Sequence, residues 1–201
     1  MPIKRLPSNG LRDMRFARAA VDNIEQAALL PEVGAALLAW VAAETPENVA
    51  HGVLIGAVAL SFYVKPRYTE DVDILFLHKS DIPTTIPGFK AHRKGAFQEN
   101  KTHVEIEVVT GNSFSPPVPQ AIVSKVFATA VMHGKIRVAS AEGLVALKLY
   151  GAGNPERHFK DLGDVTSILL EHNPKLDMIG WNLGEEEIAR YFEVKTKLGM
   201  L

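Results

Sequence analysis

The sequence predicts an α+β fold in which a small mixed β-sheet with flanking helices is followed by a helical C-terminal part. Three observations predict it. A short apolar run, Val53–Ile55, reaches a glycine and continues as a helix-forming segment. The segment Val104–Val109 alternates apolar and acidic residues, which is typical of a strand with one buried face. After residue 139 the chain has the pattern of successive helices.

Composition narrows the class of protein. The chain has 201 residues, of which 47% are hydrophobic, enough to bury a substantial core. Its net charge of −1 lacks the overall basic character of a dedicated nucleic-acid binder. The absence of cysteine excludes disulfides, a thiolate nucleophile and a thiolate zinc site.

Membrane insertion is not expected. The first residues lack the apolar centre of a signal peptide. The most apolar run near them, Val33–Ala43, has eleven residues and is too short to span a bilayer. We therefore expect a soluble, cytoplasmic protein with no membrane partner.

The N-terminal part, residues 1–50, is predicted to be a helical segment packed on the core. From about Phe16 to Glu44, apolar residues recur at three-to-four spacing, with an interruption at Pro31. The chain then enters the strand at Val53. A helix should follow it from Ala57 and end before Lys65-Pro66, because the residue before proline leaves the α region.

A second strand, Asp71–Leu77, carries two carboxylates at its start. Side chains two residues apart on a strand point the same way, so Asp71 and Asp73 project together while Val72 and Ile74 face the core. Like charges this close resist ionising together unless a positive charge lies between them. We expect Mg²⁺ or Mn²⁺ as that charge.

The rest of the sheet region, which we place at residues 51–138, contains a second acidic pair. A proline-containing loop at 78–88 leads to the alternating strand, on which Glu105 and Glu107 share one face. If this strand pairs with the previous one, these acids lie beside Asp71 and Asp73. A helix over Gln120–Met132 and a short strand at 135–139 should follow.

The C-terminal region, residues 139–201, should consist of three helices. Ser140 is the expected N-cap of the first. Asn154 is the expected cap of the second, with Pro155 at its first position. An amphipathic helix at 184–198 closes the chain.

Three features along the sequence point to the same chemistry: a glycine turn, a carboxylate pair and a third acid. Gly56 stands at a strand-to-helix turn, where backbone amides can bind phosphate and glycine permits close approach. The carboxylate pair and the third acid suit magnesium, which binds one or two carboxylates plus phosphate oxygens. Each signal alone is weak, but their order and spacing indicate nucleotidyl transfer. Dinucleotide, P-loop and nucleophile-elbow motifs are absent from the sequence.

The segment Val53–Leu170 resembles the polymerase-β-like nucleotidyltransferase superfamily. In that family a glycine followed by Gly or Ser precedes a DxD or DxE on the next strand, and here thirteen residues separate Ala57 from Asp71. The strings PRYTEDVD, LVALKLYG and RHFKDLGD are similar to those of small bacterial nucleotidyltransferases of the abortive-infection and toxin–antitoxin type.

The resemblance implies a nucleotidyltransferase-type sheet and roles for single residues. It places Gly56 against the triphosphate and makes Asp71 and Asp73 metal ligands. Glu107 is the preferred third catalytic acid and metal ligand, and Glu105, on the same face, stays an alternative.

Further nucleotide contacts follow from the same resemblance, each with a structural alternative. Lys148 would reach a phosphate or pair with an acid. Lys160 and Asp161 match a later KD motif, yet suit capping and surface pairing equally well. Arg67 and Thr69 would orient phosphate or Asp71, although Arg67 also fits a solvated loop.

Two departures from the family pattern bear on activity. Ala57 replaces the second Gly or Ser and is counted with the nucleotide-binding positions. The third acid is Glu, whose side chain is one methylene longer than that of the Asp found in the family. Both leave room for a slow or lapsed enzyme.

Two functions follow. The first is a metal-dependent enzyme that moves a nucleoside monophosphate from an NTP, such as ATP, to a hydroxyl of RNA (tRNA among the acceptors), protein or a small molecule, releasing pyrophosphate. The second is a lapsed nucleotidyltransferase that binds nucleotide or a partner protein, such as a toxin or antitoxin. A purely structural role rests only on the apolar helix at 33–43.

Overall fold

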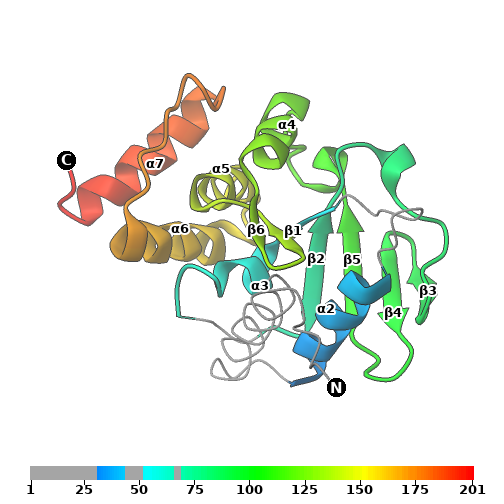
Figure 1. The fold of residues 1–201 in the computed structure, drawn as a ribbon. Helices are drawn as coiled ribbons and strands as arrows, with labels where there is room; N and C mark the ends of the chain where they lie inside the picture. Colours follow the sequence, from blue (N-terminus) through cyan, green and yellow to red (C-terminus); the bar gives the residue numbers. More distant parts are fainter. Residues whose placement is uncertain (1–30, 44–51, 66–68) are drawn as a thin grey trace, which may run out of the picture.

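The computed structural model describes residues 31–43, 52–65 and 69–201 (Figure 1). These residues form one seven-stranded mixed sheet with the strand order β3-β4-β5-β2-β1-β7-β6. Its strands are β1 (Val53–Ile55), β2 (Asp71–Leu75), β3 (Phe89–Arg93), β4 (Ala96–Glu99), β5 (Glu105–Val109), β6 (Val131–His133) and β7 (Ile136–Val138).

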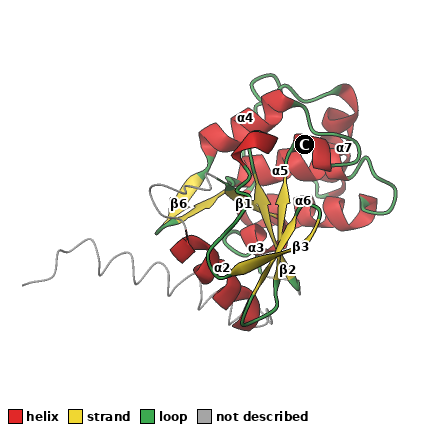
Figure 2. Ribbon diagram, turned by 90° about the vertical axis from the view of Figure 1, so that its right-hand side faces the viewer, coloured by secondary structure: helices red, strands yellow, loops and turns green. Residues whose placement is uncertain are grey.

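The helices lie against this sheet and beyond its β1 side (Figures 1 and 2). They are α2 (Pro31–Ala43), α3 (Gly56–Leu60), α4 (Gln120–Thr129), α5 (Ala141–Gly151), α6 (His158–His172) and α7 (Glu185–Lys197). Two short 3-10 turns, η1 (Lys79–Asp81) and η2 (Gly111–Ser113), follow β2 and β5. The predicted α+β class with a helical C-terminal part is confirmed.

The middle of the sheet sets the register of the acidic residues. Strand β2 runs antiparallel to β1 and parallel to β5. In the parallel pair Asp71 lies opposite Glu105, and Asp73 lies opposite Glu107. The two acidic strands are therefore neighbours, with their carboxylates in two adjacent rungs on one face.

Helix α2 covers the other face of the sheet. Trp40 is buried and packs edge-on against Phe89 and Phe97, with ring centroids 5.7 and 6.1 Å apart. Phe97 pairs with Ile106 across β4 and β5, and Ile106 pairs with Val72. Because neighbouring residues in adjacent strands share a face, α2 lies opposite the carboxylates and leaves their face uncovered.

Helix α5 is the centre of the helical part. Its residues from Gly143 to Gly151 are all buried, and it packs against α3, α4, α6 and α7. Ser140 caps it as predicted, since its Oγ accepts a hydrogen bond from the Gly143 amide at 3.1 Å. One continuous hydrophobic core joins α2, the sheet and the C-terminal helices. The domain boundaries after residues 50 and 138 stay predictions.

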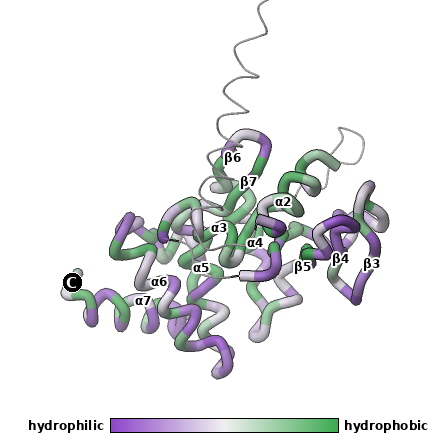
Figure 3. The backbone as a smooth tube through the Cα atoms, turned by 90° about the horizontal axis from the view of Figure 1, so that it is seen from below, coloured by the Kyte–Doolittle hydropathy of each residue, from purple (hydrophilic) through white to green (hydrophobic). Residues whose placement is uncertain are grey.

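Several elements differ from the sequence prediction. The hairpin β3–β4 was not predicted, because its exposed edge strand FKAHR has little apolar alternation. Figure 3 shows β3 as the hydrophilic edge of the sheet. The predicted helix at 120–132 ends at Thr129, and β6 follows it. Helix α3 ends at Leu60 and continues only as a turn towards Lys65.

The prediction that Asn154 caps a helix was wrong. Its side-chain oxygen accepts a hydrogen bond from the Glu156 amide at 3.0 Å, so it stabilises a turn, and α6 begins at His158. The N-terminal helix begins at Pro31 in the described residues, and the predicted stretch at 16–30 lies outside them. No helix in the described ranges is both long and apolar enough to cross a bilayer.

Candidate active site

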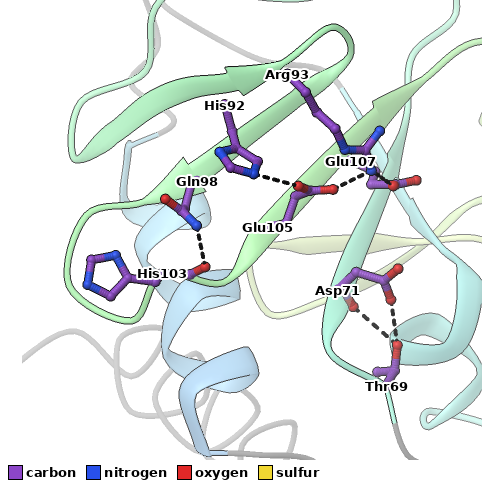
Figure 4. Close-up of polar contacts among 8 residues, drawn as sticks. All are labelled: Thr69, Asp71, His92, Arg93, Gln98, His103, Glu105 and Glu107. Atoms are coloured by element: carbon purple, nitrogen blue, oxygen red, sulfur yellow. Dashed lines mark hydrogen bonds and ion pairs between the residues drawn. The ribbon is translucent and has the colours of Figure 1, made fainter.

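The acidic residues of β2 and β5 gather on one face of the sheet (Figure 4). All four are partly exposed, whereas Val72, Ile74 and Ile106 between them are buried. This is the alternation expected for a strand pair with one buried and one open face. The predicted convergence of Asp71, Asp73, Glu105 and Glu107 on one face agrees with this register.

Gly56 fits against Asp73. Its neighbour Ile55 is the register partner of Asp73 in β1 and β2. Gly56 has φ +69°, and a Cβ built on it would lie 1.9 Å from the Asp73 Oδ2. A side chain at this position would displace the carboxylate, so glycine is required by both the backbone conformation and the close approach.

Asp73 is held in an unfavourable electrostatic environment. Burial, reinforced by the neighbouring charges of Asp71 and Glu107, raises its pKa from 3.8 to about 6. Lys148 and Arg157 oppose this shift only in part. A bound cation would reverse the balance, because it favours the ionised carboxylate.

Thr69 orients Asp71. The threonine is buried, and its hydroxyl donates a hydrogen bond to Asp71 Oδ1 at 2.6 Å (Figure 4). A hydrogen bond of this kind fixes the rotamer of the carboxylate. The other carboxylate oxygen, Oδ2, is then the one that could bind a metal ion. This placement agrees with the predicted alternative in which Thr69 acts on Asp71.

Arg93 from the edge strand β3 is a cationic partner that the sequence did not reveal. Its guanidinium forms ion pairs with both Glu105 and Glu107 (Figure 4). These contacts, with the hydrogen bond to Glu105 foremost, raise the pKa of Arg93. His92 lies 3.5 Å from Glu105 by its Nε2. Only a prediction of β3 and its register could have found Arg93.

The donor set suits magnesium, although its side chains do not enclose an ion by themselves. Among the described residues, no three His, Cys, Asp or Glu side chains are grouped closely enough to hold a metal. Mg²⁺, however, usually binds one or two carboxylates and completes its shell with water and substrate phosphates. Asp71 and Asp73 supply such a pair of hard oxygen ligands, and the crowded charge at Asp73 favours a cation there.

A pocket of about 210 Å³ opens beside these carboxylates. Its lining combines Gly56, Asp73 and Glu107 from the sheet side with Lys148, Asn154 and Arg157 from the helical side. Glu107 lines this pocket and lies opposite Asp73, whereas Glu105 does not line it. The pocket therefore joins two acids at one wall to two cations at the other.

The cations are held by buried acids from α6. Lys148 Nζ lies 2.8 Å from Asp161 Oδ1 and 2.7 Å from Asp164 Oδ2, and all three side chains are at most 9% exposed. Asp161 Oδ2 also accepts a hydrogen bond from Arg157 Nε at 3.1 Å. The second interpretation of Lys148, pairing with an acid, thus agrees with the geometry, and the guanidinium of Arg157 is anchored by one nitrogen.

The other predicted positions are dispersed. Lys160 is exposed on α6 and does not line the pocket. Ala57 is buried at the start of α3. Arg67 lies outside the described residues. Arg157 stands in the RHFKDLGD string, yet no role was predicted for it.

No family model matches the chain, and neither does any curated protein. A solved structure of an antigenic nucleotidyltransferase-like protein from Paracoccidioides brasiliensis is similar over 73% of this chain and 79% of its own, with 19% identity and a TM-score of 0.47. A similarity at this level supports no conclusion about function. Any functional inference therefore rests on the geometry of the site.

Proposed function

We propose that the chain is a metal-dependent nucleotidyltransferase that moves a nucleoside monophosphate from an NTP to an acceptor hydroxyl. The observation that carries the proposal is the pocket that joins Asp73 and Glu107 to Lys148 and Arg157, with Asp71 on the adjoining rung. Carboxylates on one side suit a cation, and cations on the other suit phosphate oxygens.

The residues of the site would have separate roles in this reaction. Asp71 and Asp73 would hold Mg²⁺ or Mn²⁺, which when bound neutralises phosphate charge and stabilises the leaving pyrophosphate. Arg157 would bind phosphate oxygens through its two Nη groups, since the hydrogen bond that Asp161 accepts comes from its Nε. Gly56 leaves the space that Asp73 needs.

The transfer step is a single substitution at phosphorus. The acceptor oxygen bonds to the α-phosphorus, and the bond from that phosphorus to the α,β-bridging oxygen breaks. Pyrophosphate leaves with the electron pair of the broken bond. Glu107, next to Asp73 on the pocket wall, would accept the hydroxyl proton.

The test is ATP binding measured by calorimetry with and without Mg²⁺. We expect metal-dependent binding to the native chain and its loss in Asp73→Asn. Glu185→Gln, which removes an exposed carboxylate on α7, is the matched control and should bind like the native chain. Metal-independent binding that survives Asp73→Asn would contradict the proposal.

One observation favours a second function, a lapsed enzyme that binds nucleotide or a partner protein without turnover. Arg93 already pairs with Glu107, the acid proposed to accept the proton. If this ion pair persists with substrate bound, Glu107 is a poor base. Metal-dependent ATP binding with no pyrophosphate release, tested with RNA, protein and small-molecule hydroxyls, would support this alternative.

A further inference from the structure

The edge strand β3 sends a cation across the sheet to the acidic face. Strand β4 lies between β3 and β5, so Arg93 reaches Glu105 and Glu107 over the strand that separates them. The register partner of Arg93 on β4 is Ala96, which is in turn the register partner of Glu107. Because the side chain of Ala96 is a single methyl group, it leaves the guanidinium a path to the carboxylates.

An irregularity in β3 aims two side chains at these acids. The pairing with β4 shifts register between Ala91 and Arg93, which leaves His92 as an extra residue on β3. Such a bulge re-aims side chains and is common beside active sites. His92 lies 3.5 Å from Glu105 by its Nε2, and Arg93 pairs with the same carboxylate (Figure 4). The bulge therefore turns both side chains towards β5.

The four acids of the site are not compensated alike. Arg93 forms ion pairs with Glu105 and Glu107 on β5. Within the part of the chain that the structure describes, no lysine or arginine forms an ion pair with Asp71 or Asp73 on β2. One pair of acids thus has a cation supplied by the chain itself, and the other pair does not.

We propose that Arg93 is a tethered cation that keeps a second metal ion out of the site, so that the chain uses one divalent ion, bound by Asp71 and Asp73. The inference rests on the proposed function and deepens it, because it assigns the number of metal ions. In two-metal sites the ions lie about 3.5–4 Å apart, and a second ion here would need Glu107, the neighbour of Asp73, as a ligand. The guanidinium already supplies positive charge to that carboxylate.

Arginine suits this role because its guanidinium is always charged and its planar fork can contact two carboxylates at once. The Arg93 side chain is 52% exposed. Ion pairs with this much exposure contribute little to stability. We therefore expect Arg93 to affect the number of bound metal ions much more than the melting temperature, which a purely structural ion pair would not do.

The experiment titrates Mn²⁺ alone into the metal-free chain and counts the free ions by their paramagnetic resonance signal. We expect one ion on the native chain and its loss in Asp73→Asn. Arg93→Gln should bind two ions, the second at least about tenfold more tightly than any second ion binds the native chain. Adding Glu107→Gln to Arg93→Gln should remove the second ion again.

Lys90→Gln is the charge-matched control, because it removes an exposed cation from the same strand and should bind one ion. Two ions on the native chain, or one ion on Arg93→Gln, would overturn the inference and leave the proposed function intact. Equal gains in Arg93→Gln and Lys90→Gln would overturn it too, since net charge alone would then explain them.

Failure of the proposed function has a different signature. Absence of Mn²⁺ from the native chain would contradict the metal site on Asp71 and Asp73. An ion gained in Arg93→Gln and lost again with Glu107→Gln would, even then, support the exclusion of metal by Arg93. Absence of any ion from both Arg93→Gln and the native chain would overturn both proposals.

Discussion

At the scale of the residue, the site depends on how Gly56 and Asp73 share space. Gly56 is the first residue of α3, directly after the end of β1, and it has a positive φ. Its missing side chain is the space that the Asp73 carboxylate fills. Gly56 is predicted from the family resemblance to contact the triphosphate, and in the structure it also sets the position of Asp73, a proposed metal ligand.

Gly56→Ala should abolish metal-dependent ATP binding and destabilise the fold. The left-handed backbone costs about 1–2 kcal/mol for a non-glycine residue, and the new methyl group would also collide with Asp73. Gly88→Ala is the matched control, because Gly88 has φ +84° and open space at its Cβ position. Equal unfolding free energies and unchanged ATP binding in both variants would show that the close approach has no effect.

Asp73 is predicted to lower the stability of the metal-free protein. Its folded pKa of about 6 exceeds the ordinary 3.8, so the native state holds the proton more tightly than the unfolded state does. Stability therefore falls as the pH rises from about 4 to about 6 and stays lower above that range.

We expect Asp73→Asn to raise the unfolding free energy at pH 7 by about 1–2 kcal/mol. A shift of two pKa units corresponds to about 3 kcal/mol, and the partial exposure of the side chain reduces the effect. Urea unfolding at pH 4 and pH 7 in metal-free buffer measures it. The gain should be present at pH 7 and nearly absent at pH 4, and a destabilised variant at pH 7 would contradict the assignment.

At the scale of the element, the site requires α5 and α6 to be locked together. Lys148 on α5 lies between Asp161 and Asp164 of α6, and the same Asp161 anchors Arg157. Gly151 permits this packing, because a Cβ there would lie 2.3 Å from Asp161 Oδ2. The charged cluster therefore joins two helices and positions one phosphate-binding arginine.

Lys148→Met should destabilise the protein by about 3–5 kcal/mol, because it removes the buried cation that pairs with both Asp161 and Asp164. Lys197→Met is the matched control. It breaks a 2.6 Å pair with Glu193, both side chains are largely exposed, and the expected loss is below about 1 kcal/mol. Adding Asp161→Asn and Asp164→Asn to Lys148→Met should recover stability in denaturant unfolding, and similar losses for the two lysine variants would contradict this account.

Elements with a strong local pattern could be predicted, and those fixed by tertiary contacts could not. Strand β5 was evident from the alternation around Glu107, and Ser140 was recognised as the cap of α5. The hairpin with Arg93 escaped prediction because its edge strand is stabilised by pairing with β4 and by Trp40 packing on Phe89. Asn154 has the chemistry of a cap, and only the observed hydrogen bond shows that it stabilises a turn.

In the candidate site, too, some residues could be placed from the sequence and others could not. The grouping of Asp71 and Asp73 follows from the two-residue period of a strand, and their proximity to Glu107 required only that β2 and β5 pair. The contacts of Lys148 with α6 depend on how α5 and α6 pack, which no local pattern specifies, whereas Arg157 and Asp161 form an i,i+4 pair at the start of α6. Charged residues of long reach are therefore the part of the site that sequence alone places least well.

At the scale of the whole molecule, the layers leave the acidic face open. Helix α2 packs on the opposite face of the sheet (Figure 1). Residues of α5 and of the turn before α6 line one side of the pocket. The stability of the fold and the charge of the site are consequently coupled. Asp71, Glu107, Lys148 and Arg157 all act on Asp73, and a cation that relieves its repulsion should stabilise the entire structure.

This coupling should be measurable in thermal unfolding. Mn²⁺ alone should raise the melting temperature of the native chain at pH 7.5 and do so much less at pH 5, because a proton replaces the cation on Asp73 below about pH 6. Metal at 100 times its dissociation constant contributes about 2.7 kcal/mol, and each kcal/mol is worth about 2–4 °C in a chain of this size. Thermal unfolding of the native chain and Asp73→Asn at both pH values measures the effect. An equal shift at the two pH values, or the same shift in the variant, would show that Mn²⁺ binds away from Asp73.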